Sequence, residues 1–380
     1  MSNGPIRCTY GNFPELTKYR DKIYVVYAGC MSEMSITRRT NEDLIEEIKD
    51  AVNAGYTKII YHNAGETLLY GTTFKIQNAI EASPFYNDTM FFMQTSGYDA
   101  QAAYDKIRQE CPWFTRKLNI LSCDHFEFIT AQFALGLYEK VIPQYQIKTK
   151  QKKFVCFNKV DRVQRVQLLA KVLNTPGMLE NSFYSFEGTH SDWHSLHATA
   201  RFGENIAETL KNYAHLFPLK LNITPNRENP IDLIPEDLYY HDESYFSVIT
   251  ETVFYAKNEY WRPHAILNYA DGVFISEKTY RPIAMKHPFI LMAYPGTLKR
   301  LRERGYKTFS PFIDESYDDI IDGEQRLEAI FKEISRLCAF TDEQWLEWQT
   351  NIKPIVEYNY ENFNSKTEFG LHSVEHLFAN

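Results

Sequence analysis

The chain has 380 residues, which is too long for one ordinary core and fits two medium-sized domains. Its hydrophobic content of 44% and charged content of 24% are those of a soluble globular protein. The net charge of −8 argues against a protein whose whole surface binds nucleic acid, because such surfaces are usually basic, although a local basic groove would not show in the sum.

The six cysteines are scattered, without a CxxC pair or the Cys/His spacing of structural zinc, which indicates a reducing compartment. The first residues lack the apolar stretch of a signal peptide. No later segment approaches the ~18 apolar residues that a membrane span needs. We therefore expect a cytoplasmic protein without a membrane span.

The first 150 residues alternate between short apolar runs, typical of buried strands, and amphipathic stretches, typical of helices. In chain order we expect a strand at 22–28, a helix at 41–53, a strand at 58–62, a helix at 70–82 and strands at 90–93 and 118–122. This alternation predicts a mostly parallel sheet with helices on both faces.

Residues 143–153 are polar and basic, and we interpret them as an inter-domain linker. After the linker we expect strands at 153–158, 246–251, 272–275 and 287–291, and helices at 162–173, 205–216, 323–338 and 345–358. The prediction is an N-terminal domain at 1–148, a C-terminal domain at 149–340 and, at 341–380, helices that pack back across both. The fold class is α/β, with two Rossmann-like domains facing a central cleft where a ligand would bind.

The tetrapeptide 276–279, Ser-Glu-Lys-Thr, lies between the expected strand at 272–275 and an amphipathic helix. Ser276 or Thr279 can cap that helix. Pro282 is tolerated only in a first turn, so we expect the helix to begin close to residue 278 or 279.

Charged side chains at this helix start suit a nucleotide. A helix N-terminus beyond a strand end binds anions, Lys278 adds a full positive charge, and Arg281 lies one turn on. Glu277 cannot favour a phosphate, and its natural partner is a pair of vicinal hydroxyls such as a ribose diol. The alternative is a capped helix with solvated charges.

A second basic helix start strengthens the nucleotide interpretation. Residues 158–165, Asn-Lys-Val-Asp-Arg-Val-Gln-Arg, also follow an expected strand and open an expected helix, and they include Arg162 and Arg165. Two basic helix starts in one domain would suit a diphosphate.

Three short motifs occur in a specific order: Thr-Glu-Thr at 250–252, Phe-Ile-Ser-Glu-Lys-Thr at 274–279 and Pro-Phe-Ile at 288–290. This order resembles the signature of a group of virus- and phage-encoded predicted glycosyltransferases. The Ser-Glu-Lys-Thr segment after an expected strand, with a helix and an apolar strand following, resembles the C-terminal domain of the fucosyltransferase family of GT-B glycosyltransferases. The resemblance covers residues 153–335, and the first 150 residues show no motif that matches.

The resemblance implies roles for individual residues. Glu277 resembles the family's ribose-binding glutamate and Lys278 its diphosphate-binding lysine. Arg165 is similar to the phosphate-binding arginine, with Arg162 as the fallback, and Glu251 would face the sugar or ribose. Where the family usually has Thr, this chain has Ser276, which keeps the hydroxyl. The long segment 174–242 departs from a compact fucosyltransferase domain and leaves the donor sugar open.

The implied activity is transfer of a hexose or pentose from a UDP- or GDP-sugar to a hydroxyl acceptor, with inversion and with no other cofactor. If the chain is viral, this would take place in the host cytoplasm. No Asp-x-Asp flanked by apolar residues is present, and the acidic pairs at 314–315 and 318–319 resemble a solvated surface run. We therefore expect metal-independent chemistry, with Lys278 and Arg165 in place of a metal ion.

The catalytic base should come from the N-terminal, acceptor-side domain. Glu66 is the first candidate, because a Gly-containing turn directly after a strand would project it into the cleft; a helix-capping glutamate is the alternative. Asp124 and His125, after the strand ending at Ser122, are the second candidates.

Two further functions compete with transfer to a carbohydrate. The same chemistry could act on hydroxymethylated bases of viral DNA, as in bacteriophage DNA glucosyltransferases, with the basic runs 148–153 and 299–304 following the phosphates. The chain could instead be a non-catalytic nucleotide-binding module. Hydride transfer and Walker-type phosphoryl transfer are not indicated, because neither glycine-rich motif is present.

Overall fold

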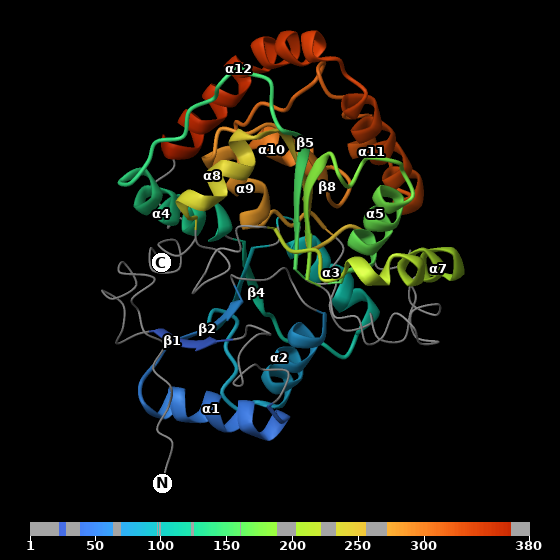
Figure 1. Cartoon of the computed structure of the whole chain (residues 1–380). Coiled ribbons are helices and arrows are strands. Elements are labelled where there is room, and N and C mark those ends of the chain that lie inside the picture. The colour runs from blue at the N-terminus through green and yellow to red at the C-terminus, as the bar shows by residue number, and fades with distance from the viewer. Residues whose placement is uncertain are drawn as a thin grey trace. The chain divides into compact units, whose positions relative to one another are not determined.

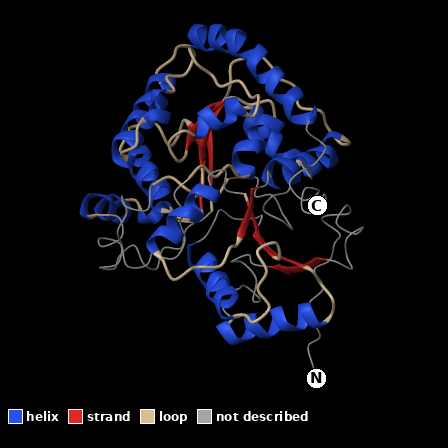
Figure 2. Ribbon diagram, turned by 180° about the vertical axis from the view of Figure 1, so that it is seen from behind, coloured by secondary structure: helices blue, strands red, loops and turns tan. Residues whose placement is uncertain are grey.

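The computed structural model describes residues 23–27, 39–63, 70–96, 98, 100–122, 125–159, 161–187, 203–221, 233–255 and 272–365. They form two compact units, each with its own four-stranded parallel sheet and helices (Figures 1 and 2). The predicted α/β class with two Rossmann-like sheets is therefore confirmed. The central cleft stays a prediction.

In unit 1 the strands follow one another across the sheet in sequence order, β1-β2-β3-β4, and every pair is parallel. Its elements are β1 (Ile23–Tyr27), α1 (Asn41–Asn53), β2 (Lys58–Asn63), α2 (Tyr70–Ala82), β3 (Phe91–Thr95), α3 (Ala100–Glu110) and β4 (Asn119–Ser122). Helices α1 and α2 have the predicted bounds.

Helix α1 shows why the local sequence pattern was enough to predict this helix. Thr40 and Asp43 form a capping box at its start, and Leu44, Ile48 and Ala51 bury one stripe at helical spacing. Helix α3 was missed; it also buries three residues, but these are Ala100, Tyr104 and Ile107, and an alanine and a tyrosine mark an apolar stripe less clearly than the leucine and isoleucine of α1.

Unit 2 holds the strands β5 (Lys152–Asn158), β6 (Ser182–Phe186), β7 (Ser244–Thr250) and β8 (Phe289–Met292), all parallel, in the order β6-β5-β7-β8. Its α-helices are α4 (His125–Tyr138), α5 (Val163–Leu173), α7 (Glu204–Asn212), α8 (Pro235–Asp242), α9 (Glu277–Ala284), α10 (Thr297–Glu303), α11 (Gly323–Cys338) and α12 (Asp342–Ser365). The 3-10 turns are η5 (Ala214–Leu216) and η6 (Ser316–Asp319). Figure 1 shows α8, α9 and α10 on one side of this sheet and α5 and α11 on the other.

The strand order creates a topological switch point. The chain leaves β5 for β6 on one side and later returns to β7 on the other side of β5. In open α/β sheets, the crevice beyond the carboxyl ends of two such strands is the usual ligand site. The carboxyl ends of β5 and β7 therefore mark the expected ligand site of unit 2.

The expected strand at 272–275 is wrong. Val273, Phe274 and Ile275 are buried, but they form no strand. Both edges of β7 are already paired with β5 and β8, so this run finds no free place beside β7. Burial alone explains its apolar character.

Helix α9 begins earlier than expected. Its first residue is Glu277, so Pro282 is the sixth residue of the helix and lies beyond the first turn. The cap comes from Ser276, one of the two residues predicted for that role.

The division between the compact units lies between His125 and Phe126 in the chain, whereas the sequence suggested residue 148. Helix α4 belongs to unit 2 because its side chains bind there. Tyr138 donates to the carbonyl of Ala284 at 2.8 Å, and the buried Glu127 accepts from Arg304 and Tyr306. α4, α8, α10 and β6 were not predicted.

The basic run at 148–153 is packed into unit 2. The Lys148 ammonium lies 2.7 Å from the carboxylates of both Asp242 and Glu243. Lys150 donates to the Asp242 carbonyl at 2.6 Å, and burial lowers the pKa of Lys150 to about 8. This segment is therefore part of the body of unit 2 rather than a solvated linker.

The C-terminal helix α12 is anchored by Trp345, which is fully buried and stacks on Tyr245 with ring centroids 4.0 Å apart. α12 also contacts α9, so within unit 2 it supports the helix that carries the Ser-Glu-Lys-Thr motif. None of the helices in the described ranges has both the length and the apolar character that crossing a membrane requires.

Candidate functional site

The two basic helix starts meet beyond the ends of β5 and β7. Helix α5 begins at Val163 and helix α9 at Glu277. Both contact the segment 250–252, the last residue of β7 and the two that follow it. The structure thus brings together the two clusters that the sequence identified separately, at the switch point of the sheet.

Glu251 lies at the centre of this arrangement and is fully buried. Its Oε1 accepts hydrogen bonds from the Ser276 amide at 2.9 Å and from the Thr279 hydroxyl at 2.6 Å. Its Oε2 accepts from the Ser276 hydroxyl at 2.7 Å and the Thr252 amide at 3.1 Å. The sequence suggested that Glu251 faces the donor sugar or ribose, but its carboxylate instead holds the start of α9.

The first amides of α9 already have partners within the helix start. The Lys278 amide donates to the Ser276 hydroxyl at 3.3 Å, and the Thr279 amide donates to the Ser276 carbonyl at 3.1 Å. An anion at this end of α9 would therefore be bound mainly by side chains and less by backbone amides than the sequence suggested.

Glu277 and Lys278 form an ion pair with 2.9 Å between Oε1 and Nζ. Their side chains are 16% and 29% exposed, so a ligand can reach both. Burial acts to raise the pKa of Glu277, but the Lys278 charge and hydrogen bond, with Arg281, bring that pKa below its usual value. Glu277 is therefore ionised at neutral pH, so an acceptor lies beside the Lys278 donor.

Three side chains at the start of α5 contact three successive carbonyls after β7. Arg165 donates to the carbonyl of Thr250 at 3.1 Å, Gln164 to that of Glu251 at 3.0 Å and Arg162 to that of Thr252 at 3.5 Å. Arg162 is the N-cap residue and makes no side-chain cap hydrogen bond to the helix. The first turn of α5 is therefore not capped by that side chain.

Arg165 and Arg162 differ in accessibility. Arg165 is 4% exposed, whereas Arg162 is only partly buried. Burial, with the nearby Arg162 charge, lowers the pKa of Arg165 to about 10, so its guanidinium stays protonated at neutral pH. Arg165, which the sequence suggested first as the phosphate-binding arginine, is therefore a buried positive charge at this site. Arg162, the second candidate, is the more accessible of the two.

Buried polar residues that the sequence did not single out support this edge of the sheet. The Thr250 hydroxyl donates to the Asn158 side-chain carbonyl at 2.6 Å, and Asn158 donates to the Cys156 sulfur at 3.1 Å. Burial raises the pKa of the Cys156 thiol to about 12, so this cysteine is unreactive. The signal available in the sequence was Asn158 at a strand end, directly before a basic helix start.

The predicted catalytic bases lie largely outside the described residues. Glu66 and Asp124 belong to segments that the structure does not describe, and of His125 only the backbone position at the start of α4 is described. Their roles stay predictions.

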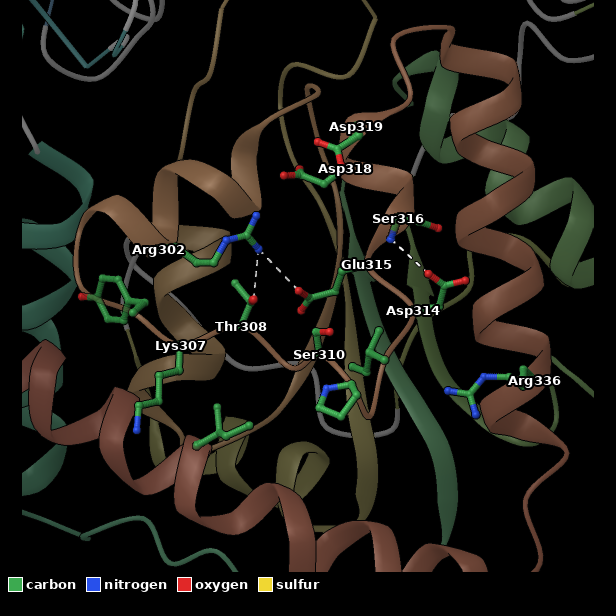
Figure 3. A pocket seen from close by; sticks show the side chains of 14 residues that line it. Arg302, Lys307, Thr308, Ser310, Asp314, Glu315, Ser316, Asp318, Asp319 and Arg336 are labelled. Atoms are coloured by element: carbon green, nitrogen blue, oxygen red, sulfur yellow. Dashed lines mark hydrogen bonds and ion pairs between the residues drawn. The ribbon is translucent and has the colours of Figure 1, made fainter.

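A pocket of about 1130 Å³ lies elsewhere in unit 2 and shares no lining residue with the starts of α5 and α9 (Figure 3). The acidic pairs at 314–315 and 318–319 line it; Asp314 and Asp319 are exposed, as expected of a solvated run, whereas Glu315 is partly buried and Asp318 is buried. Asp318 is buried and caps α10 by accepting from the amides of Leu298 and Lys299 at 3.0 Å. Glu315 accepts from the Phe309 amide at 2.5 Å and from Arg302.

Glu315 and Asp318 serve the fold by satisfying backbone amides, and Glu315 also pairs with Arg302. Over the part of the chain that the structure describes, no group of three or more His, Cys, Asp or Glu residues is placed to hold a metal ion.

No known family model matches the chain, and no curated protein matches it. Among solved structures it is similar to an alpha,alpha-trehalose 6-phosphate synthase from Burkholderia multivorans, with 12% identity, a TM-score of 0.43 and coverage of 96% of this chain and 72% of that one. It is also similar to a UDP-forming alpha,alpha-trehalose-phosphate synthase from Burkholderia xenovorans, with 11% identity, a TM-score of 0.44 and coverage of 96% of this chain and 76% of that one. A UDP-forming alpha,alpha-trehalose-phosphate synthase from Burkholderia vietnamiensis is similar with 11% identity, a TM-score of 0.43 and coverage of 94% of this chain and 70% of that one. At these identities and TM-scores the likeness assigns neither a family nor an activity.

Proposed function

We propose that this chain is a nucleotide-sugar-dependent glycosyltransferase whose donor binds at the starts of α5 and α9. The observation that carries the proposal is the convergence of Arg162, Arg165 and Lys278 with an ionised Glu277 at a sheet switch point. Cations at an uncapped helix start suit a diphosphate, and a carboxylate beside them suits a diol. A nucleoside diphosphate carries both groups.

Each part of the donor has a proposed partner. The first turn of α5, with the partly buried Arg162 and the buried Arg165, would bind one phosphate, and Lys278 the other. Glu277 would accept hydrogen bonds from the ribose hydroxyls. Arg281, one turn into α9, adds positive charge behind Glu277. The three ordered motifs that resemble glycosyltransferases of the GT-B type support the same assignment.

The proposed reaction is inverting transfer from a UDP- or GDP-sugar to a carbohydrate hydroxyl. As the glycosidic bond breaks, negative charge develops on the departing nucleoside diphosphate, and Lys278 and the two arginines would stabilise that charge without a metal ion. A base in unit 1 would take the acceptor proton, with Glu66 the first candidate and Asp124 or His125 the second.

We do not extend the proposal to DNA as the acceptor. In the basic run 148–153, Lys148 and Lys150 are engaged with Asp242 and Glu243. In the run 299–304, Arg300 pairs with Glu303, Arg302 with Glu315 and Arg304 with Glu127. Lysines and arginines that already pair with carboxylates of their own chain are less available to bind the phosphates of a duplex and so to release its counterions.

The test is a thermal-shift screen of the wild-type protein with UDP-, GDP-, CMP- and dTDP-sugars. We expect one nucleotide class to raise the melting temperature, because a ligand that binds only the folded state stabilises it by about 2.7 kcal/mol at 100 times its Kd. Release of the free nucleotide in the presence of candidate acceptors then measures turnover. If no nucleotide stabilises the protein, the proposed function is wrong.

Binding without turnover would favour the non-catalytic nucleotide-binding module. The variants Glu66→Gln, Asp124→Asn and His125→Gln separate these outcomes once turnover is found. A transferase loses turnover in at least one of them and still binds the nucleotide. If all three variants retain full turnover, the base lies elsewhere.

A further inference from the structure

We propose that Glu251 is a positioning residue that holds both donor-binding helix starts in one geometry. The inference rests on the proposed function and adds to it, because it explains how α5 and α9 are kept in register with each other. Glu251 acts through Lys278 and the arginines rather than by touching the donor.

The segment 250–252 joins the two helices through different parts of its chain. Its three carbonyl groups accept from Arg165, Gln164 and Arg162 on the α5 side. Its one carboxylate, that of Glu251, accepts from Ser276 and Thr279 on the α9 side. A shift of this segment would therefore move the cations of both helices together.

A carboxylate is the side chain that can satisfy this position. Glu251 accepts four hydrogen bonds, two on each oxygen, and all four come from amide or hydroxyl donors. Hydrogen bonds to an ionised acceptor are stronger than neutral ones, and they offset the cost of burying the charge. In a glutamine of the same shape, an NH2 group replaces one of the two oxygens, and its N–H groups would face the two donors that this oxygen accepts from.

Glu251 is connected to Lys278, the proposed phosphate-binding lysine, through Ser276, the N-cap residue of α9. Ser276 donates to Glu251 and at the same time accepts from the backbone amide of Lys278 at 3.3 Å and from its ammonium at 3.0 Å. Weakening the hold of Glu251 on Ser276 therefore releases Lys278 from its position. The nucleoside part of a donor depends on this contact only through Glu277, whereas the diphosphate depends on it through Lys278, so the affinity that the diphosphate adds isolates the effect on Lys278.

The experiment measures how much the diphosphate adds to affinity in Glu251→Gln. Kd values for UDP and uridine, and for GDP and guanosine, are measured by calorimetry or NMR titration well below the melting temperature of each variant. In the wild type we expect the ratio of nucleoside Kd to nucleoside diphosphate Kd to be large, because the diphosphate adds the contacts with Lys278 and the arginines. We expect that ratio to fall roughly 10- to 100-fold in the variant, because small misplacement of binding groups has effects of that size.

Glu333→Gln is the matched control. Glu333 is also a buried carboxylate of unit 2, accepting from the Asp314 amide at 2.9 Å and from Arg336 at 2.6 and 2.7 Å, and it lies away from the α5 and α9 starts. We expect Glu333→Gln to lower stability without changing the ratio. Should Glu251→Gln fail to fold, Thr279→Val removes one donor to Glu251 Oε1 and is expected to lower the ratio by a smaller factor.

The outcomes separate this inference from the proposed function. If UDP or GDP binds the wild type, and Glu251→Gln or Thr279→Val keeps the wild-type ratio, Glu251 only stabilises the fold and the inference is overturned. The same holds if Glu333→Gln lowers the ratio equally. If neither nucleotide binds the wild type, the proposed function fails first.

Discussion

Replacing Lys278 by alanine perturbs the proposed donor site with little expected effect on folding. The Lys278 ammonium lies 2.9 Å from the Glu277 carboxylate, and both side chains are partly exposed. Partly exposed ion pairs contribute about 0.2–1 kcal/mol to stability. The variant should therefore fold and melt close to the wild type.

The expected loss of nucleotide affinity is much larger. A hydrogen bond to a charged group contributes about 1.5–3 kcal/mol, which corresponds to roughly 10- to 150-fold in Kd. The substitution also removes the cation that offsets the Glu277 carboxylate next to the phosphates. Both effects act in the same direction, so we expect at least a 10-fold rise in Kd for the nucleoside diphosphate.

Isothermal calorimetry with UDP and GDP measures this effect directly. Lys332→Ala is the control, because Lys332 is an exposed lysine of the same unit, on α11. We expect the control to bind like the wild type. If Lys278→Ala also binds like the wild type, Lys278 does not contact the phosphates and the reasoning about α9 is refuted.

Further predictions concern stability, pH, metal and DNA. Trp345→Ala should lower the free energy of unfolding by about 3–5 kcal/mol in urea titrations, because Trp345 is fully buried against Tyr245, whereas Trp113→Ala, at a 57% exposed residue, should change it little. Burial, with His241, lowers the pKa of His287 well below its usual value, so the unfolded chain takes up a proton first as the pH falls. The free energy of unfolding should keep its full value above about pH 6.5 and decline below it. His287→Gln should reduce the slope of that decline between about pH 6.5 and 5, and an equal slope in the variant and the wild type would contradict this. Turnover should persist in EDTA, and a loss restored by a divalent cation would rule out metal-independent transfer. Affinity for duplex DNA should show no steep dependence on salt.

Local pattern in the sequence determined most elements of secondary structure. The apolar spacing in 41–53 and 70–82 predicted helix bounds that the structure reproduces, and residue type limited the cap of α9 to Ser276 or Thr279, of which the structure has Ser276. Such signals lie within one or two turns of the chain, so they can be read without knowing the fold. The same is true of the two basic helix starts.

Only the tertiary structure decided which segments meet. The apolar run at 273–275 is buried without forming a strand, because β7 already has neighbours on both edges. The acidic residues Glu315 and Asp318 cap and pair within unit 2, although their sequence resembles a solvated run. Residue type does not identify these partners, and for Asp318 they lie about one helix and one loop away in the chain, at Leu298 and Lys299.

Glu251 shows the same limit at the proposed donor site. The sequence identified it as part of a motif and pointed it towards the ligand. The strand order β6-β5-β7-β8 places the end of β7 between the starts of α5 and α9, where donors from the α9 start surround the carboxylate. A glutamate's role here follows from which donors surround it, and those donors are assembled only when the sheet forms.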